Sequence, residues 1–556
     1  MRFSVLILAA ALVATACGSG DRPATASSAS SMGGTIIIPI LGDARDIFPV
    51  YVSEMNGRRV QDLVFDHLAE IDPSLTTIGD KTFSPRLAEK WAWTPDSLSI
   101  AFSINPKARW HDGKPVTAND VRYSFEAFTD SKAASPVASL LGNVDSVSVR
   151  DSLTAVVWFK KHTPEQFYDV AYQLIIMPKH VYGAIPVEQL RTSDKTHTIV
   201  GSGRFRVVRW EPGTRIELVA DTANYRGRAK LDRVIFVPTD AAAAAAQILT
   251  GQADVMEAFP NDQLSQLDSS KVARPYTVPQ LGYMTMGMNR FVRKSKTVPH
   301  PIFSDARVRR ALSMAVDREA MLQNVFGKNG HLSHGPFAMA ASFADSAISP
   351  PRFDTTAAKA LLDSAGWPVG ANGIRAKNGR PLTFSLGTTS SAFRRRYSVL
   401  LQDQLAKIGV HVDIEPINDA TAYDVISSGD FDAVLWGFSP DPGPSGFIQT
   451  WGTAGIGQGQ NYLRYSSKKV DALIDSATSS FDRAKSKTYM SKAIQAIMDD
   501  VPAIWLYDIS FTNAINRRID VAPFRADGWW VNLADWSIPA DKRIDRDRIG
   551  LDAPKP

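Results

Sequence analysis

The sequence predicts an α/β protein with a parallel layer in its main sheet, and three observations lead to this prediction. The chain has 556 residues, enough for two or three domains with cores of their own. In its second half, short apolar runs alternate with segments of helical spacing. Apolar runs near residues 35 and 431 stop abruptly in loops rich in Pro, Gly and Asp. Loops of this kind, at the carboxyl ends of strands, are where open α/β sheets bind ligands.

The parallel layer is predicted between residues 382 and 436. Strands are expected at Leu382–Leu386, Val410–Ile414 and Phe431–Trp436, and helices at Arg394–Ile408 and Ala420–Ser428 separate them. A strand, helix, strand, helix, strand order builds parallel pairs, because each crossover returns the chain to the same edge of the sheet.

The remaining elements are predicted from caps and apolar spacing. Thr35–Leu41 is expected to be the first strand, and Leu98–Ile104 a returning strand of a hairpin. The middle of the chain, Thr76–His197, is expected to hold strands and hairpins with one helix. Further helices are expected at Val60–Leu68, from Thr117 to Phe128, from the Thr239–Asp240 cap to Gly251, and at Ala357–Ala365 after Thr355.

The stretch FDAVLWGFSPDPGPSGFIQTW, residues 431–451, is predicted to leave the sheet as a shaped loop. Trp436, Phe438 and Phe447 would offer flat apolar surface to a ligand, and Asp441 one localised negative charge for a cationic group. The alternative is a rigid surface loop in which Asp441 caps its own turn before Pro442.

The N-terminus has the pattern of a bacterial secretory signal. Met1 and Arg2 precede a short apolar run that ends in small residues before Cys17, the only cysteine of the chain. Cys17 stands where a lipoprotein is cleaved and lipid-modified, which would leave a net charge of +5 − 1 = +4 after Arg2 is removed. The alternative is a plain secreted protein that keeps an unused thiol. Residues 17–34 are rich in Ser, Ala and Gly, which predicts a flexible tether.

Composition and motifs exclude several functional classes. The 62 basic and 57 acidic side chains are scattered without a basic run, which argues against nucleic-acid binding. The sequence has no phosphate loop, zinc-protease helix or nucleophile elbow, so we expect no enzyme and no cofactor. His331 and His334 without a third ligand make a weak metal site, so no metal is expected. Arg394–Arg396 opposes a helix dipole, and it faces solvent or reaches an anionic ligand group.

Several segments resemble one protein family. They are SPRLAEKWAWTPDSLSIAFSINPKARWHDGKPVTANDVRYSFEAF (residues 84–128), Gly201–Phe205, Asn224–Tyr225, Ile248–Asp254 and FSDARVRRALSMAVDRE (residues 303–319). Together they resemble the bacterial extracellular solute-binding proteins of the dipeptide, oligopeptide and nickel type, family 5, which feed ABC importers.

The resemblance implies a two-lobed periplasmic-binding-protein fold of class II with an extra inserted subdomain. It also implies a hinge of two crossing segments, near Tyr276–Met284 and near Ile504–Tyr507. The implied boundaries are a signal peptide at residues 1–16, a discontinuous first lobe at 35–62, 200–277 and 506–556, an inserted subdomain at 63–199, and a second lobe at 278–505.

The implied function is capture of a peptide-like ligand between two closing lobes and its delivery to an ABC importer permease. The protein would be a monomer in the cell envelope, periplasmic or at the cell surface, and held to a membrane by its N-terminal lipid. Alternatives are a non-peptide solute such as a metal chelate, an opine or a sugar, a solute sensor without a permease, and a secreted hydrolase or chaperone on the same scaffold.

The resemblance also points to ligand-binding residues. In peptide-binding relatives an Asp follows the strand-end Trp by three residues, where this chain has Ser439, so Asp441 is the most plausible acceptor of a ligand amine. The loop in which dipeptide-specific relatives carry an Arg and a Tyr is Thr388-Thr389-Ser390-Ser391 here, which argues against a zwitterionic dipeptide. The candidate ligand contacts are Asp441, Trp436, Gly437, Phe438, Ser439, Asp46, Thr388, Ser390 and Tyr283.

Overall fold

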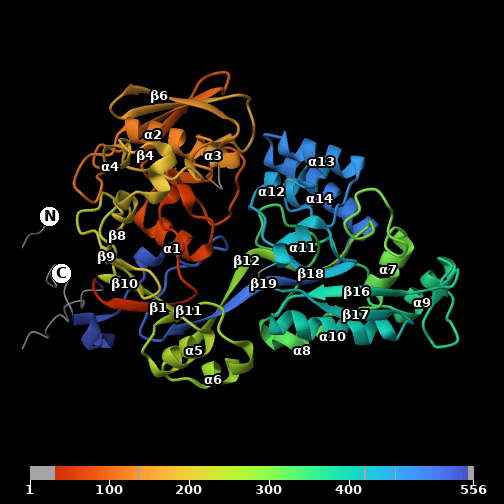
Figure 1. Ribbon diagram of the computed structural model, residues 1–556. Helices are drawn as coiled ribbons and strands as arrows, with labels where there is room; N and C mark the ends of the chain where they lie inside the picture. Colours follow the sequence, from red (N-terminus) through yellow and green to blue (C-terminus); the bar gives the residue numbers. More distant parts are fainter. Residues whose placement is uncertain (1–31, 136–137, 419–420, 458, 549–556) are drawn as a thin grey trace, which may run out of the picture.

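The protein is built from two lobes joined by two long antiparallel strands (Figure 1). The computed structural model describes residues 32–135, 138–418, 421–457 and 459–548. The joining strands are β12 (Ala273–Met288) and β19 (Ala503–Asn516), which pair from Ala273 opposite Asn516 to Gly287 opposite Ala503. The predicted signal peptide, Cys17 and most of the tether lie outside the described residues. No helix in the described ranges is long and apolar enough to cross a membrane.

The two joining strands lose register between Pro279 and Tyr283, opposite Ser510 and Asp508. Irregular pairing at this point locally breaks the ladder between the lobes, which is what a hinge requires. The first predicted crossing includes this break. The second was predicted at Ile504–Tyr507, and another loss of register, between Met284 and Thr285, lies opposite Tyr507 and Trp505 within that range.

The first lobe is organised on a four-stranded sheet in the order β1-β10-β9-β8. Strand β1 runs parallel to β10, and β10 is antiparallel to β9. Helix α5 begins after the Asp240 cap and ends at Gly251, whose φ of 81° needs a glycine. The elements of this lobe are β1 (Thr35–Leu41), α1 (Met55–Val64), β8 (Phe205–Glu211), β9 (Arg215–Ala220), β10 (Arg233–Thr239), α5 (Ala241–Thr250), β11 (Val255–Met256) and α6 (Leu264–Ser269).

The prediction of a helix at Val60–Leu68 was wrong in its bounds. Helix α1 starts five residues earlier, because the Glu54 carboxylate accepts hydrogen bonds from the backbone N–H groups of Asn56 and Gly57. It ends at Val64, where Phe65 adopts an extended backbone.

The stretch between α1 and β8 forms a subdomain with a four-stranded antiparallel sheet, β4-β5-β7-β6. Thr117 and Asp120 make the capping box predicted for helix α2. The elements are β2 (Ala69–Ile71), β3 (Phe83–Pro85), β4 (Ala88–Trp93), β5 (Ser99–Ile104), α2 (Ala118–Thr129), β6 (Val144–Asp151), β7 (Thr154–Phe159), α3 (Gln166–Ala171) and α4 (Lys179–Tyr182).

The second lobe contains the predicted parallel layer. Strand β16 is parallel to both β17 and β18, and β18 continues the sheet through an antiparallel pair with β12. The elements are α7 (Ala306–Met314), α8 (Arg318–Phe326), β13 (His331–Leu332), α9 (Thr355–Ser364), β14 (Ala376–Lys377), β15 (Arg380–Pro381), β16 (Thr383–Thr388), α10 (Ala392–Ala406), β17 (His411–Pro416), α11 (Ala422–Ser428), β18 (Ala433–Phe438), α12 (Pro444–Trp451), α13 (Lys468–Thr478) and α14 (Arg483–Asp500).

Helices cover both faces of this sheet. On one face α8 and α10 pack with Ala433 and Leu435 of β18, and on the other α12, α13 and α14 pack with Val434 and Phe438. The loop predicted after β18 was wrong in its second half, because Pro444–Trp451 is helix α12. Pro444 sets the helical φ at the first position, and Phe447 and Trp451, four residues apart, are both fully buried.

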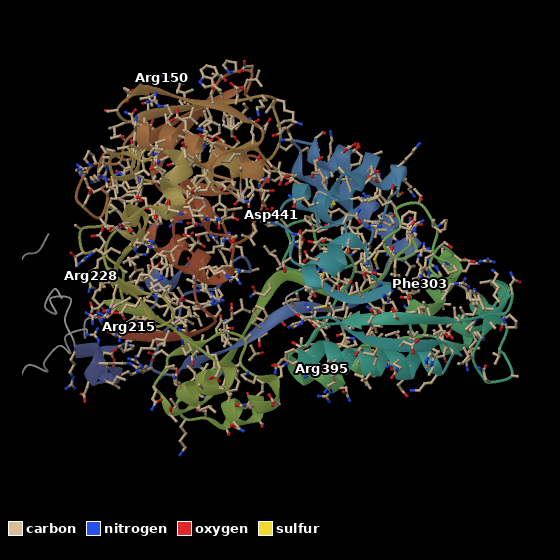
Figure 2. The ribbon with its side chains drawn as sticks, in the orientation of Figure 1. Arg150, Arg215, Arg228, Phe303, Arg395 and Asp441 are labelled. Atoms are coloured by element: carbon tan, nitrogen blue, oxygen red, sulfur yellow. The ribbon has the colours of Figure 1, made fainter. Side chains whose placement is uncertain are left out.

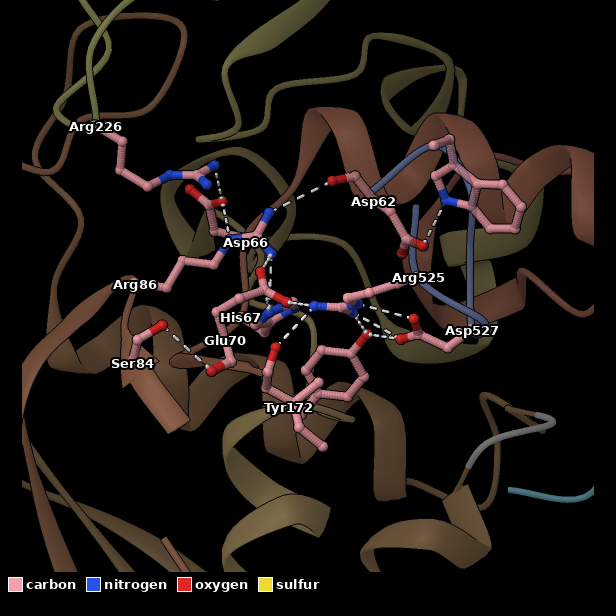
Figure 3. Close-up of polar contacts among 12 residues, drawn as sticks. Asp62, Asp66, His67, Glu70, Ser84, Arg86, Tyr172, Arg226, Arg525 and Asp527 are labelled. Atoms are coloured by element: carbon pink, nitrogen blue, oxygen red, sulfur yellow. Dashed lines mark hydrogen bonds and ion pairs between the residues drawn. The ribbon is translucent and has the colours of Figure 1, made fainter. Parts of the chain in front are cut away.

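An ion-pair network holds distant parts of the first lobe together (Figure 3). The buried Asp66 carboxylate accepts from Arg86 Nε at 2.7 Å and from Arg226 Nη2 at 2.6 Å. Burial opposes ionisation, but the guanidinium groups of Arg226 and Arg86 lower the pKa of Asp66. Glu70 connects Arg86 to Arg525 near the C-terminus, at 2.5 and 2.6 Å. Segments hundreds of residues apart are thereby fixed as one body.

Candidate ligand-binding site

Asp441 lies where the two lobes face each other, just beyond the carboxyl end of β18 (Figure 2). It contributes to the wall of a cavity of about 240 Å³, and the remaining wall comes from the first lobe. Those residues include Pro49, Arg58 of α1 and Tyr172, which follows α3. The carboxylate of one lobe is therefore presented to a space enclosed by the other lobe.

The Asp441 carboxylate is poorly compensated. Burial raises its pKa, and the nearby Arg58 lowers it only in part. Arg58 has its own partner, because its Nε lies 3.6 Å from the Asp62 carboxylate. Among the residues that the structure describes, neither Asp441 nor Asp169 has a hydrogen bond or ion pair on its carboxylate. The pKa of Asp169 is raised well above its usual value by burial and by its neighbours Glu165 and Asp441.

Glu165 joins the two lobes beside Asp441. Its side chain comes from the subdomain of the first lobe, and it accepts a hydrogen bond from the backbone N–H of Ser445 in α12 at 2.9 Å. The hydroxyl of Thr77 donates to the other carboxylate oxygen. Gly443 passes so close that a Cβ there would overlap Glu165 Oε1. Burial raises the pKa of Glu165, although these two hydrogen bonds oppose the rise. The hydrogen bond to Ser445 thus connects the subdomain of the first lobe to α12 of the second lobe.

Trp436 offers a half-buried ring next to the cleft. The guanidinium of Arg394 lies over this ring, 5.3 Å from its centroid, and Arg394 Nη1 donates to the Thr389 hydroxyl at 2.9 Å. Arg394 follows the start of α10, so it reaches around the end of the sheet to the Trp436 face. Of the two possibilities that the basic triplet left open, Arg394 turns inward, while Arg395 and Arg396 are exposed.

Several predicted contacts are buried beneath the wall. Tyr283 and Phe438 are 0% and 2% exposed, their rings stack at 5.6 Å, and Tyr283 Oη accepts from Trp451 Nε1 at 2.7 Å. Phe447 is also fully buried, so it forms core rather than ligand-facing surface. Gly437 lies between Met284 and Ile509, and it would crowd them if it carried a side chain. These residues support the shape of the wall from behind.

The other predicted contacts lie in separate places. Ser439 is exposed and close to Gly282 in the hinge strand. Asp46 lines a different cavity, of about 430 Å³, together with Arg191 and His197. Burial raises the pKa of Asp46, and these two groups and backbone hydrogen bonds oppose the rise. The structure thus does not bring Asp46 and Asp441 into one cavity.

The predicted contacts in the loop after β16 also lie in different surroundings. Thr388 is 3% exposed, and within the described ranges its hydroxyl has no hydrogen-bond partner. Ser390 lines a second interlobe cavity, of about 500 Å³. His331 and His334 gather no further ligands, and no group of three or more potential metal ligands occurs in the described part of the chain.

The chain was compared with known families once this geometry was clear. The model of the bacterial extracellular solute-binding proteins, family 5 Middle, matches residues 82–459, well over half of the chain. The chain belongs to this family. It is a solute-binding protein of the ABC-transporter type rather than an enzyme, and the family acts outside the cytoplasm.

Individual relatives of this family 5 protein agree with the assignment. The oligopeptide-binding protein AppA of Bacillus subtilis is 26% identical over 548 residues, which cover 96% of this chain and 98% of AppA. The structure of that AppA with a nonapeptide superimposes with a TM-score of 0.74 at 24% identity, covering 91% and 99% of the two chains. The structure of NikZ from Campylobacter jejuni with Ni(L-His) superimposes with a TM-score of 0.75 at 24% identity, covering 90% of this chain and 99% of NikZ. These structures confirm the two-lobed α/β fold.

Some of the residues at this family 5 site could not be found from the sequence pattern. Glu165, Asp169 and Arg58 are separated from Asp441 by more than 270 residues, and no motif marks them. Arg394 had one signal, the unfavourable placement of basic residues at a helix start. That signal did not say which of the three arginines turns toward the cleft.

Proposed function

We propose that this protein captures a peptide-like ligand between its lobes and delivers it to an ABC importer permease. The observation that carries the proposal is the Asp441 carboxylate, which lies in an interlobe cavity without a hydrogen bond or ion pair from any described residue. An ammonium group of the ligand would supply the missing positive charge, and its N–H donors would make charge-assisted hydrogen bonds. The uncompensated Asp169 strengthens the preference for a cationic group at this place.

A peptide fits the rest of the site better than a sugar or a metal chelate does. The half-buried ring of Trp436, five residues before Asp441, would offer an apolar face to a peptide that extends beyond the Asp441 cavity. AppA is described as oligopeptide-binding, and its solved structure holds a nonapeptide. NikZ holds Ni(L-His), so relatives of equal structural similarity bind different solutes. The carboxylate at Asp441 is what favours an amine-bearing ligand here.

Closure of the lobes would secure the ligand. The Glu165 contact with Ser445 would form only when the subdomain and α12 meet, whereas the Thr77 contact lies within the subdomain. A ligand that touches both lobes favours the state in which these contacts exist. The ligand and the hydrogen bond between Glu165 and Ser445 would therefore stabilise the same closed form.

The proposal extends to the location of the protein. Cys17 would carry a lipid that holds the protein to a membrane of the cell envelope, and residues 17–34 would give the lobes freedom to reach the permease. The ligand-bound protein would act as a monomer. Labelling with a radioactive fatty acid, lost in Cys17→Ser, tests the anchor directly.

The ligand itself is tested by native mass spectrometry of the purified protein and identification of the released molecule. A mixture of peptides supports the proposal, and a single non-peptide solute overturns the ligand class. In calorimetric titrations with a bound peptide, Asp441→Asn should weaken affinity by about ten- to a hundredfold, the equivalent of a charge-assisted hydrogen bond. Asp424→Asn, an exposed Asp in α11, is the matched control and should change nothing. Equal affinity in both variants would remove Asp441 from the site.

A further inference from the structure

A second interlobe cavity, of about 500 Å³, is lined by residues of both lobes and of β19. In Figure 1, helices α8 and α10 lie below the joining strands and α12 lies above them. None of the residues that line the second cavity lines the Asp441 cavity. Its second-lobe wall comes from α8 and α10, which cover the opposite sheet face from α12. Its first-lobe wall includes Phe259, which packs with α5 and α6 rather than with α1. The two cavities are therefore separate spaces.

Most of the wall of this second cavity is apolar. Aromatic rings come from the first lobe, from β19 and from the second lobe, and the set is Phe259, Phe326, Phe393, Tyr507 and Phe511. A cavity of this size and lining suits a small organic molecule with an aromatic or branched apolar body.

One polar group in this wall lacks a partner. Tyr507 is 8% exposed, and its ring packs edge-on against Phe326 at 4.7 Å. Among the described residues nothing makes a hydrogen bond with its hydroxyl. A ligand in the cavity that accepts or donates a hydrogen bond here would give this hydroxyl a partner.

The groups around Tyr507 favour an anionic ligand group as the hydrogen-bond partner of its hydroxyl. The cavity is lined by Ser390, Ser391 and Arg394, at the N-terminus of the 15-residue helix α10. The Ser391 side chain does not cap this helix, so backbone N–H groups of the first turn have no side-chain acceptor from it. Helix N-termini favour negative charge, whereas the arginines at the start of α10 are unfavourable unless an anion offsets them. Arg394 is close enough to Tyr507 to act on its hydroxyl electrostatically.

Asp508 is the other charged residue of this wall. Asp508 lines the same cavity as Tyr507, at a point where the pairing of the joining strands is irregular. Its carboxylate accepts from the Met339 N–H at 2.9 Å, and it acts electrostatically on Tyr283, in the core under α12. Burial also raises the pKa of Asp508 to about 6, which favours the uncharged carboxyl, so its repulsion of an anion is weakest below that pH.

We propose that this cavity is a second binding site, for a carboxylic acid with an aromatic or bulky apolar body. The carboxylate lies against Arg394, the start of α10 and the Tyr507 hydroxyl, and the body lies among the phenylalanine rings. Because both lobes contribute to the wall, an occupant of this cavity is sensitive to the angle between the lobes. Such an acid would thereby modulate closure over the main ligand without touching Asp441.

The test is calorimetric titration of the purified protein, without peptide, with 3-phenylpropionate and with its neutral amide. The acid should bind, and the amide should bind at least about tenfold more weakly because it lacks the charge. Arg394→Gln should weaken the binding of 3-phenylpropionate by about tenfold or more, and Tyr507→Phe should weaken it by about fivefold. Arg395→Gln removes the same charge from an exposed position of the same helix and should change nothing.

Three results would overturn this site: no binding of the acid, equal binding of the amide, or an equal loss in Arg395→Gln. The conservative Tyr507→Phe keeps the ring contacts, so a folding defect cannot explain its effect. Since no peptide is present, the outcome is independent of whether Asp441 receives a peptide amine.

Discussion

Two groups of charged side chains in this protein are arranged in opposite ways. In the first lobe Asp66, Glu70, Arg86 and Arg525 compensate one another at 2.5–2.7 Å, and the pKa of Asp66 is lowered. Beside the cleft, Asp441 and Asp169 have no such partner in the described part of the chain, and their pKa values are raised. Compensated charge fixes the first lobe as a rigid body. Uncompensated charge between the lobes marks the place where the missing cation arrives with a ligand.

The largest effect is expected where charge is fully compensated. Asp66→Ala should lower the free energy of unfolding by about 3–5 kcal/mol, because Arg86 and Arg226 would lose their shared buried partner. Urea denaturation followed by circular dichroism measures this. Asp145→Ala, at an exposed position of β6, should stay within about 0.5 kcal/mol of the wild type. A small effect at Asp66 would mean that the network does not hold the lobe together.

Asp508 offers an intermediate case, a carboxylate that is compensated at one oxygen only. Burial raises its pKa to about 6, although hydrogen bonds from the Met339 N–H and Ser333 oppose the rise. Within the described residues Oδ1 has no partner. The unfolded chain ionises this group near pH ~3.9, so the free energy of unfolding should fall as pH rises from about 4 to about 6.

Asp508→Asn should remove that loss. At pH 7 the variant should be more stable than the wild type by about 1–3 kcal/mol, and at pH 4 the two should be alike. Thermal unfolding at both pH values measures the difference. A variant that is less stable at pH 7 would show that the charged form of Asp508 is stabilised in the fold.

Disruption of the interlobe contact between Glu165 and Ser445 should have a smaller effect on stability and a clear effect on ligand affinity. Gly443→Ala would push α12 away from Glu165, and overpacking of this kind costs about 1–3 kcal/mol. Because the strain exists only in the closed form, ligand affinity should fall by about tenfold while the unfolding midpoint hardly moves. Ser445→Ala keeps the backbone N–H that Glu165 uses but removes a side-chain hydrogen bond to the same carboxylate, so its affinity should fall less than that of Gly443→Ala. Unchanged ligand affinity in Gly443→Ala would show that the contact between Glu165 and Ser445 does not form together with ligand binding.

The elements that follow local rules could be predicted from the sequence. Strand β1 was predicted at Thr35–Leu41 and lies there, and α5 runs between the predicted Asp240 cap and Gly251. The parallel layer of β16, β17 and β18 was likewise predicted, because caps and apolar runs are local signals.

Features that depend on contacts across the lobes could not be predicted. Helix α12 was taken as loop, because Pro442, Gly443, Pro444 and Gly446 outweigh the spacing of Phe447 and Trp451. Glu165 and Ser445 are 280 residues apart, and no sequence pattern in either segment indicates that they are in contact. The half-burial of Trp436 and the burial of Phe438, two residues apart on the same face of β18, follow from how the helices cover that face, which periodicity alone does not give.

The central claim is that the uncompensated Asp441 carboxylate receives the amino group of the ligand. The most direct test is a calorimetric cycle that combines the wild type and Asp441→Asn with one bound peptide and its N-acetylated form. The wild type should bind the acetylated peptide about ten- to a hundredfold more weakly, and Asp441→Asn should bind both forms equally. If acetylation costs the variant as much affinity as it costs the wild type, the amino group binds elsewhere and the account of this site is wrong.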